Sequence, residues 1–82
     1  MKVFTYVYIL RSDADPTHRY TGLTDDFETR LESHNQGSNP HTSKHRPWKI
    51  ETAIAFRSRE KAAAFEKYLK SHSGRAFASK HF

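Results

Sequence analysis

The segment 3–10 most constrains what this chain can fold into, because its eight residues carry no charge and are mostly apolar or aromatic. Alternate side chains of a strand point to opposite faces of a sheet, so Val7 and Ile9 share one face and Tyr8 lies on the other. A strand that is apolar on both faces is typical of the centre of a sheet that is covered on both sides. We therefore expect residues 2–11 to form a buried central strand.

The chain has 82 residues, of which 35% are hydrophobic, and this is enough for one core rather than two. We therefore expect a single domain that spans residues 1–82. The sequence contains no cysteine, which excludes disulfide bonds, thiol nucleophiles and zinc sites built on thiolates. It also contains no apolar stretch of about 20 residues and no signal-peptide pattern, so we expect a cytoplasmic protein that does not enter a membrane.

The first part of the chain is expected to form a β-hairpin followed by a helix. Turn-forming residues at 12–17 separate the first strand from a second strand over 18–24. Asp25 stands three residues before Glu28, which is the spacing of a capping box, so we expect Asp25 to begin a helix. Gly37 is suited to end that helix, because glycine readily adopts the left-handed conformation found there.

The second part is expected to form one strand and two helices. Alternating apolar residues predict a third strand over 48–56. Ser58 is expected to cap a helix that runs to about residue 71, and Gly74 marks a break before a short helix over 75–80. The order β-β-α-β-α-α predicts an α/β (α+β) fold, in which a three-stranded antiparallel sheet is flanked by helices.

Positive charge is concentrated in the second part of the chain. Residues 1–36 carry four lysines and arginines against six acidic residues, whereas residues 37–82 carry ten against three. The segment 37–47 is also polar and rich in turn-forming residues, which predicts an exposed basic loop. This asymmetry is typical of a surface that binds a polyanion such as nucleic acid. Lysines that only solvate a small domain would give the same composition.

Five polar residues stand out once they are placed on the predicted elements: Tyr8, Tyr20, Arg30, His34 and Glu66. The arginine and the histidine are four residues apart and therefore share one helix face. Glu66 lies at the rim of an otherwise apolar helix face, where a carboxylate is costly unless it finds a partner or an ion. Simpler explanations exist for each of them. Strand tyrosines commonly pack in a core, and Glu66 can pair with Lys70 one helical turn later.

In this order and spacing, the residues resemble the GIY-YIG nuclease superfamily. The matching positions are Tyr6-Val7-Tyr8, Tyr20-Thr21-Gly22, Arg30, His34-Asn35 and Glu66. The resemblance covers about residues 3–72 and is strongest to the small stand-alone members, which contain little beyond the nuclease core. Two positions depart from the pattern, because Tyr6 stands where many members have glycine and Thr21 stands where isoleucine or valine is usual.

The resemblance implies a GIY-YIG-like fold and a metal-dependent endonuclease that hydrolyses DNA with little sequence specificity, in DNA repair or recombination. One divalent ion, Mg²⁺ or Mn²⁺, would be held by Glu66, and Arg30 would face the scissile phosphate. Tyr8 is the expected general base, with Tyr20 beside it on the neighbouring strand. His34 competes for the role of base, because an ordinary histidine pKa needs no large shift, and the sequence leaves this choice open.

DNA is the expected partner, a protein partner could add specificity, and the oligomeric state stays open. The residues expected at the nucleic acid are Gly22, His41, Lys44, His45, Arg46 and Lys49. The glycine would let the backbone approach the site, and the basic segment 41–49 would follow the phosphate backbone. Trp48 could stack on a base, but a core position at the start of the predicted strand is favoured.

A non-catalytic nucleic-acid-binding module with the same fold and basic surface is the alternative. The sequence favours the nuclease, because a decayed site would be expected to have lost Tyr8, Arg30 or Glu66. A small protein-interaction domain that uses its aromatic strand faces is a weaker third hypothesis.

Overall fold

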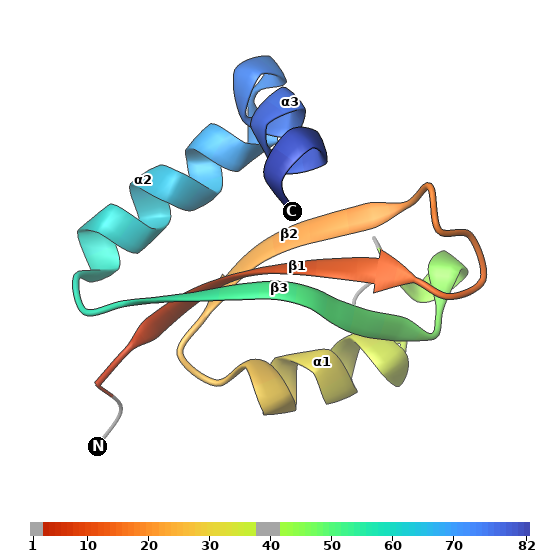
Figure 1. Cartoon of the computed structure of the whole chain (residues 1–82). Helices are drawn as coiled ribbons and strands as arrows, with labels where there is room; N and C mark the ends of the chain where they lie inside the picture. The colour runs from red at the N-terminus through yellow and green to blue at the C-terminus, as the bar shows by residue number, and fades with distance from the viewer. Residues whose placement is uncertain (1–2, 38–41) are drawn as a thin grey trace.

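The computed structural model describes residues 3–37 and 42–82. Among these residues, three antiparallel strands form one sheet with the order β2-β1-β3. The strands are β1 (Thr5–Ser12), β2 (Arg19–Thr24) and β3 (Trp48–Phe56). One face of the sheet is covered by α1 (Phe27–Asn35), and the other face is covered by α2 (Arg59–Lys70) and α3 (His72–His81) (Figure 1). The predicted α+β fold with the order β-β-α-β-α-α is confirmed.

Strand β1 lies at the centre of the sheet because both of its faces bury apolar side chains. Val7 and Ile9 belong to a core cluster with Leu69 of α2, on the side of the sheet that α2 and α3 cover. Tyr8 and Leu10 belong to a second cluster on the α1 side. All four of these β1 side chains are at most 3% exposed. The prediction of a central strand that is covered on both faces is confirmed.

Helix α1 begins one residue later than predicted. Its cap is Asp26, whose carboxylate accepts a hydrogen bond from the backbone N–H of Thr29 at 3.3 Å. Asp25, the predicted cap, instead lies 3.9 Å from the guanidinium of Arg59. Gly37 follows the C-cap with φ +79°, a conformation that favours glycine, so its prediction as the end of this helix is confirmed.

Helices α2 and α3 meet at a corner at Ser71. The cap of α2 at Ser58 and its end directly before Ser71 are as predicted. The hydroxyl of Ser71 then caps α3 by accepting from the N–H of Gly74 at 3.1 Å, so α3 begins at His72, earlier than predicted. Gly74 therefore lies in the first turn of α3 and is not a break. A Cβ at Gly74 would collide with the backbone carbonyl of Tyr68, so the glycine is needed for the close approach of the two helices.

The predicted exposed loop 37–47 is partly wrong. Residues 38–41 lie outside the described part of the chain, but Thr42 is fully buried and Ser43–His45 form a short 3₁₀ helix, η1. Trp48 is 4% exposed, and its indole N–H donates to the carbonyl oxygen of Thr42 at 2.8 Å. The core position favoured for Trp48 is confirmed. Thr42 is buried with the indole, because the buried N–H donor of Trp48 requires an acceptor and the carbonyl oxygen of Thr42 supplies it.

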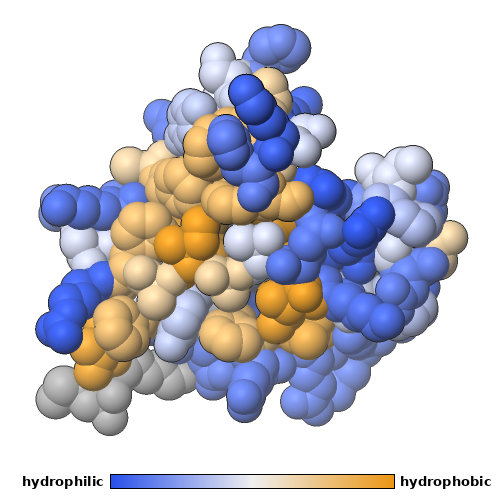
Figure 2. Space-filling view, in the orientation of Figure 1, coloured by the Kyte–Doolittle hydropathy of each residue, from blue (hydrophilic) through white to orange (hydrophobic). Residues whose placement is uncertain are grey.

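The hydropathy of the surface follows the layers. Figure 2 shows apolar residues gathered where α2 and α3 meet the sheet, and hydrophilic residues over α1 on the lower side of the same view. This distribution is typical of amphipathic helices that each bury one stripe against a sheet. Within the described ranges, no helix combines the length and the apolar character that crossing a membrane requires.

We predict that Gly74→Ala destabilises the protein by about 1–3 kcal/mol, because the added methyl group must displace the backbone at the end of α2. In a helix without such a contact, alanine would be the more stable residue. Urea denaturation of both proteins measures the difference. Ser73→Ala, an exposed neighbour in the same turn, is the control and should change stability by less than about 0.5 kcal/mol. Equal stability of Gly74→Ala and the parent would contradict this account of the corner.

Candidate active site

Tyr8 projects from β1 to the α1 side of the sheet and is only 2% exposed. Its partner across the strand pair is Gly22 of β2. A Cβ at Gly22 would collide with the phenol of Tyr8, so the ring lies directly over the glycine. Because β2 is an edge strand, the missing side chain lets the hydroxyl of Tyr8 extend across it towards the edge of the sheet. Gly22 thus makes room for the tyrosine.

His34, near the end of α1, is fully buried and contacts the hydroxyl of Tyr8. Its Nε2 lies 3.1 Å from Tyr8 Oη, and its Nδ1 lies 2.8 Å from Thr42 Oγ1. Burial lowers the pKa of His34, and the positive charge of Arg30 lowers it further. The imidazole is therefore neutral near neutral pH, so one ring nitrogen accepts a hydrogen bond while the other donates.

Two contacts that sequence reasoning missed hold His34 in place. The first is the hydroxyl of Thr42, eight residues further along the chain. The second acts through Asn35, whose side-chain oxygen accepts from the N–H of Trp48 at 2.6 Å and whose amide donates to the carbonyl of Trp48 at 3.1 Å. This pair fixes the end of α1 to the start of β3. No local spacing rule identifies these partners, because each contact forms between different elements.

Tyr20 completes an aromatic cluster around the imidazole. It stands opposite Leu10 in the β1–β2 register and is half-buried. The centre of its ring lies 4.8 Å from that of His34 and 6.3 Å from that of Tyr8. The structure therefore brings three of the predicted site residues into contact, although they come from three different elements.

Arg30 and Glu66 bring opposite charges to this cluster. Burial raises the pKa of Tyr8 well above its ordinary value; the neighbouring Tyr20 raises it further, Arg30 lowers it and Glu66 raises it. Arg30 is exposed on α1, whereas Glu66 belongs to α2 on the opposite face of the sheet. The hydroxyl of Tyr8 lies over Gly22, on the edge strand β2, and the charges of both helices act on it there.

Glu66 also forms the local ion pair that its sequence position suggested. Its Oε2 lies 2.6 Å from Nζ of Lys70, and its side chain is 19% exposed. In residues 3–37 and 42–82, no three histidine, aspartate or glutamate side chains gather into a group that could hold an ion by themselves. Mg²⁺ and Mn²⁺ commonly take one or two carboxylates and complete their coordination with water and phosphate oxygens. A single, partly exposed carboxylate such as Glu66 fits an ion of this type.

The residues predicted to contact nucleic acid lie mainly around η1 and the start of β3. The exposed cations of this set are Lys44, Arg46 and Lys49. Lys49 lies 3.5 Å from the carboxylate of Asp13, so its charge is paired. His45 stacks on His18 with ring centres 3.8 Å apart, and His41 lies outside the described residues. Lys44 and Arg46 are therefore the members of this set whose positive charge no described carboxylate neutralises.

A family model for the GIY-YIG catalytic domain matches residues 4–80, which is nearly the whole chain. The chain therefore belongs to the GIY-YIG nuclease family, as its motifs predicted. Nucleases of this family generally use a divalent metal ion, and the family implies DNA as the substrate. A search of curated proteins gave no match.

The two departures from the family pattern have structural explanations. The ring of Tyr6 packs edge-on against Phe27 with ring centres 4.8 Å apart, so it stabilises the start of α1 against β1. Thr21 pairs with Ile9 and lines a cavity on the α3 side of the sheet. Neither substitution removes a residue of the Tyr8 cluster.

We predict that His34 makes stability depend on pH. The pKa of His34 in the folded protein lies below the ordinary value of 6.5, so the unfolded chain takes up a proton first as the pH falls. The stability that depends on neutral His34 is complete above pH 6.5 and is lost as the pH falls towards the folded pKa. Urea denaturation between about pH 7.5 and 5.5 should show a smaller loss in His34→Gln than in the parent. The same slope in both proteins would contradict a neutral, buried imidazole.

Proposed function

We propose that this chain is a metal-dependent endonuclease that hydrolyses phosphodiester bonds in DNA with little sequence specificity. The observation that carries the proposal is the buried hydrogen bond between Tyr8 and His34, on which the charges of Arg30 and Glu66 act. Phosphodiester hydrolysis requires a group that takes a proton from water, a cation for the phosphate and a carboxylate for the metal ion. Such an activity would suit DNA repair or recombination.

Tyr8 and His34 act as one proton-transfer unit in this proposal. Because burial raises the pKa of Tyr8, the phenol is protonated at neutral pH and a free phenolate is not the resting base. His34 is fully buried, so it reaches water through the hydroxyl of Tyr8. As water attacks phosphorus, Tyr8 takes a proton from the water and passes its own proton to Nε2 of His34. Thr42 supports the transfer because its hydroxyl can accept a hydrogen bond from Nδ1–H of the imidazolium.

Arg30 is the cation that would bind the scissile phosphate. It is exposed, stands one helical turn before His34, and acts electrostatically on both His34 and Tyr8. A planar guanidinium can donate two parallel hydrogen bonds to phosphate oxygens. As the bond from water oxygen to phosphorus forms, the bond to the leaving oxygen breaks and that oxygen takes a proton from solvent. Arg30 stabilises the negative charge that increases on the phosphate during this step.

Glu66 is the residue that would hold the divalent ion. The chemistry supplied by such an ion, when bound, is neutralisation of negative charge on the phosphate and leaving oxygens. Lys70, 2.6 Å away, otherwise neutralises the carboxylate. Because the ammonium and the ion compete for the same oxygen atoms, ion binding would make the charge of Lys70 available to other phosphates of the substrate.

We predict that Glu66→Gln and Arg30→Gln each reduce the rate of DNA cleavage by about 10²–10⁴, because each removes a charge that acts on the transition state. Cleavage of a labelled DNA carrying a flap, a nick and a single-stranded region is measured with Mg²⁺, with Mn²⁺ and with a chelator. Glu60→Gln, the same change at an exposed position of α2, is the control and should cleave at the parental rate. Cleavage by all variants alike, or in the chelator, would assign the activity to a contaminant or another site.

We predict that Lys44→Gln and Arg46→Gln each flatten the dependence of DNA binding on salt, by about 0.7–0.9 in the slope of log K against log salt. The physical reason is that each exposed cation which meets a phosphate releases one condensed counterion. Binding is measured in the chelator by fluorescence anisotropy, with Lys61→Gln on α2 as the control. An unchanged slope would show that the phosphate backbone does not contact Lys44 or Arg46. DNA binding without cleavage under any metal would favour the non-catalytic nucleic-acid-binding module.

A further inference from the structure

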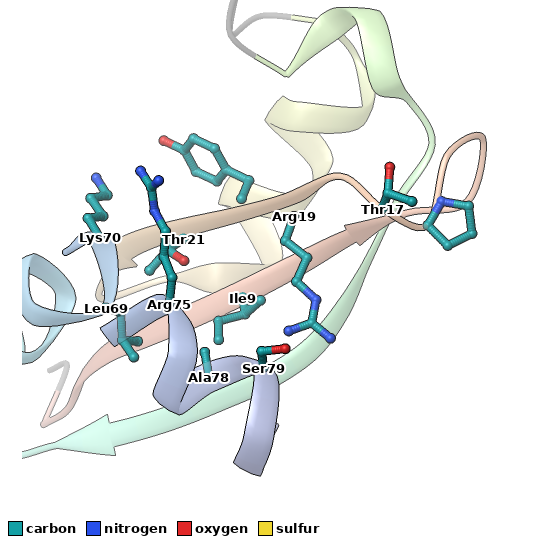
Figure 3. A pocket seen from close by; sticks show the side chains of 11 residues that line it. Ile9, Thr17, Arg19, Thr21, Leu69, Lys70, Arg75, Ala78 and Ser79 are labelled. Carbon is teal, nitrogen blue, oxygen red and sulfur yellow. The ribbon is translucent and has the colours of Figure 1, made fainter. Parts of the chain in front are cut away.

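A cavity of about 690 Å³ opens at the β2 edge, between the β1–β2 loop, the strands and helices α2 and α3 (Figure 3). Its lining combines strand and helix residues, among them Ile9, Arg19, Tyr20, Leu69, Lys70 and Arg75. Neither the proposed chemistry nor the basic segment 41–49 uses most of these residues. The cavity therefore requires its own explanation.

Among the residues that the structure describes, the charged groups of the cavity are all positive. Arg19, Lys70 and Arg75 line it, and no carboxylate from the same residues does. Arg19 and Lys70 each have an acidic partner outside the lining, Glu51 at 3.1 Å and Glu66 at 2.6 Å. Arg75 forms no ion pair with any residue of 3–37 or 42–82. The cavity thus presents at least one positive charge that nothing in the described chain neutralises.

The arrangement of the lining separates a polar end from an apolar floor. In Figure 3 the side chains of Lys70 and Arg75 extend in the same direction, whereas Arg19 points the other way, towards Ser79. Ile9 lies between Arg75 and Arg19, and Leu69 lies beneath Lys70. Each of these two apolar side chains is 3% exposed. A ligand that fits combines an anionic group with an apolar part, and pockets of about 300–1,000 Å³ hold molecules larger than a lone phosphate. A nucleotide has this combination, with a phosphate at one end and a base at the other.

The cavity adjoins the candidate active site, because two of its lining residues contact residues of that site. Tyr20 both lines the cavity and contacts the imidazole of His34. Lys70 both lines the cavity and pairs with Glu66, the expected metal ligand. A nucleotide in the cavity would therefore be a neighbour of the phosphate at the active site. A base that is paired and stacked in a duplex cannot enter such a cavity without leaving the helix, and this costs a few kcal/mol.

We propose that the cavity binds one unpaired nucleotide of the substrate strand, next to the cleaved bond, with its phosphate at Arg75 and Lys70 and its base on the apolar floor. This inference rests on the proposed nuclease function, and it names the substrate class. DNA in which the nucleotide beside the cleaved bond is already unpaired, as in a flap, a bulge or a single-stranded end, is favoured because no base pair has to be opened.

Binding without catalysis tests the cavity independently of nuclease activity. A short fluorescein-labelled oligothymidylate is titrated with the parent protein and its variants in a chelator. Arg75→Gln should weaken binding about tenfold, since it removes a charged hydrogen bond to phosphate. Ser79→Phe should weaken binding similarly by filling the cavity. The matched controls on α3 are Lys80→Gln and Ser73→Phe, which lie outside the lining and should bind as the parent does.

Cleavage tests the substrate class. The rate is compared on a fully paired duplex and on the same sequence with one unpaired nucleotide, and the parent should prefer the second. In Arg75→Gln the ratio of the two rates should fall towards one, whereas Lys80→Gln should keep the parental ratio. The proposal would be overturned if Arg75→Gln and Ser79→Phe both bound oligothymidylate as tightly as the parent does. It would also be overturned if Arg75→Gln kept the parental ratio of cleavage rates. Thymidine monophosphate that binds as tightly as the strand would also overturn it, by assigning the cavity to a free small molecule.

The two proposals fail in different ways. A parent protein that cleaves no DNA under any metal contradicts the nuclease function, while the binding experiment in the chelator still decides whether the cavity holds an unpaired nucleotide. A parent protein that cleaves paired and unpaired DNA equally contradicts the cavity proposal and leaves the nuclease function standing. Arg75 is exposed, so its replacement by glutamine keeps the test valid if the ring added by Ser79→Phe prevents folding.

Discussion

The geometry of the site depends on one buried hydrogen bond, between the hydroxyl of Tyr8 and Nε2 of His34. It joins the central strand to α1 and can form only because Gly22 has no side chain beneath the phenol. The opposite ring nitrogen is held by Thr42, and Asn35 fixes the end of the helix to β3. Removing any of these contacts would leave a buried polar group without its partner, which costs about 1–3 kcal/mol. The chemistry and the stability of the centre of this protein therefore rest on the same atoms.

Residues from helices on both faces of the sheet act electrostatically on Tyr8, whose hydroxyl lies over the edge strand β2. Arg30 reaches Tyr8 electrostatically from α1, and Glu66 does so from α2, although the sheet lies between these helices. The same edge carries the cationic cavity, and Tyr20 belongs to both. An edge strand leaves room that a central strand does not, because one side of it is open to solvent. In the proposed mechanism, the substrate would therefore reach the hydroxyl of Tyr8 from this open side of the edge strand.

Strands and helices with a clear periodicity of apolar residues could be predicted. The errors in the helices concern their ends, where contacts with other elements decide which residue is used. The strand at 48–56 was found as predicted, because its apolar residues alternate and turn-forming residues precede it. Asp25 and Asp26 are both good helix caps; in the structure Asp26 accepts from the N–H of Thr29, whereas Asp25 lies near Arg59. From its neighbours in sequence alone, Gly74 predicts an interruption between two helices. In the structure it is required by the carbonyl of a neighbouring helix, which no local rule contains.

The sequence by itself determined the central strand, the helix faces and the identities of the five motif residues, because periodicity and motif spacing depend only on neighbours along the chain. Only the tertiary structure decided that Tyr8 lies over Gly22, that Thr42 is buried against His34, and that a cationic cavity opens beside them. Each of these features is a contact between segments that are separate in sequence. These contacts form when the helices pack on the two faces of the sheet, and the packing of side chains in three dimensions sets that arrangement.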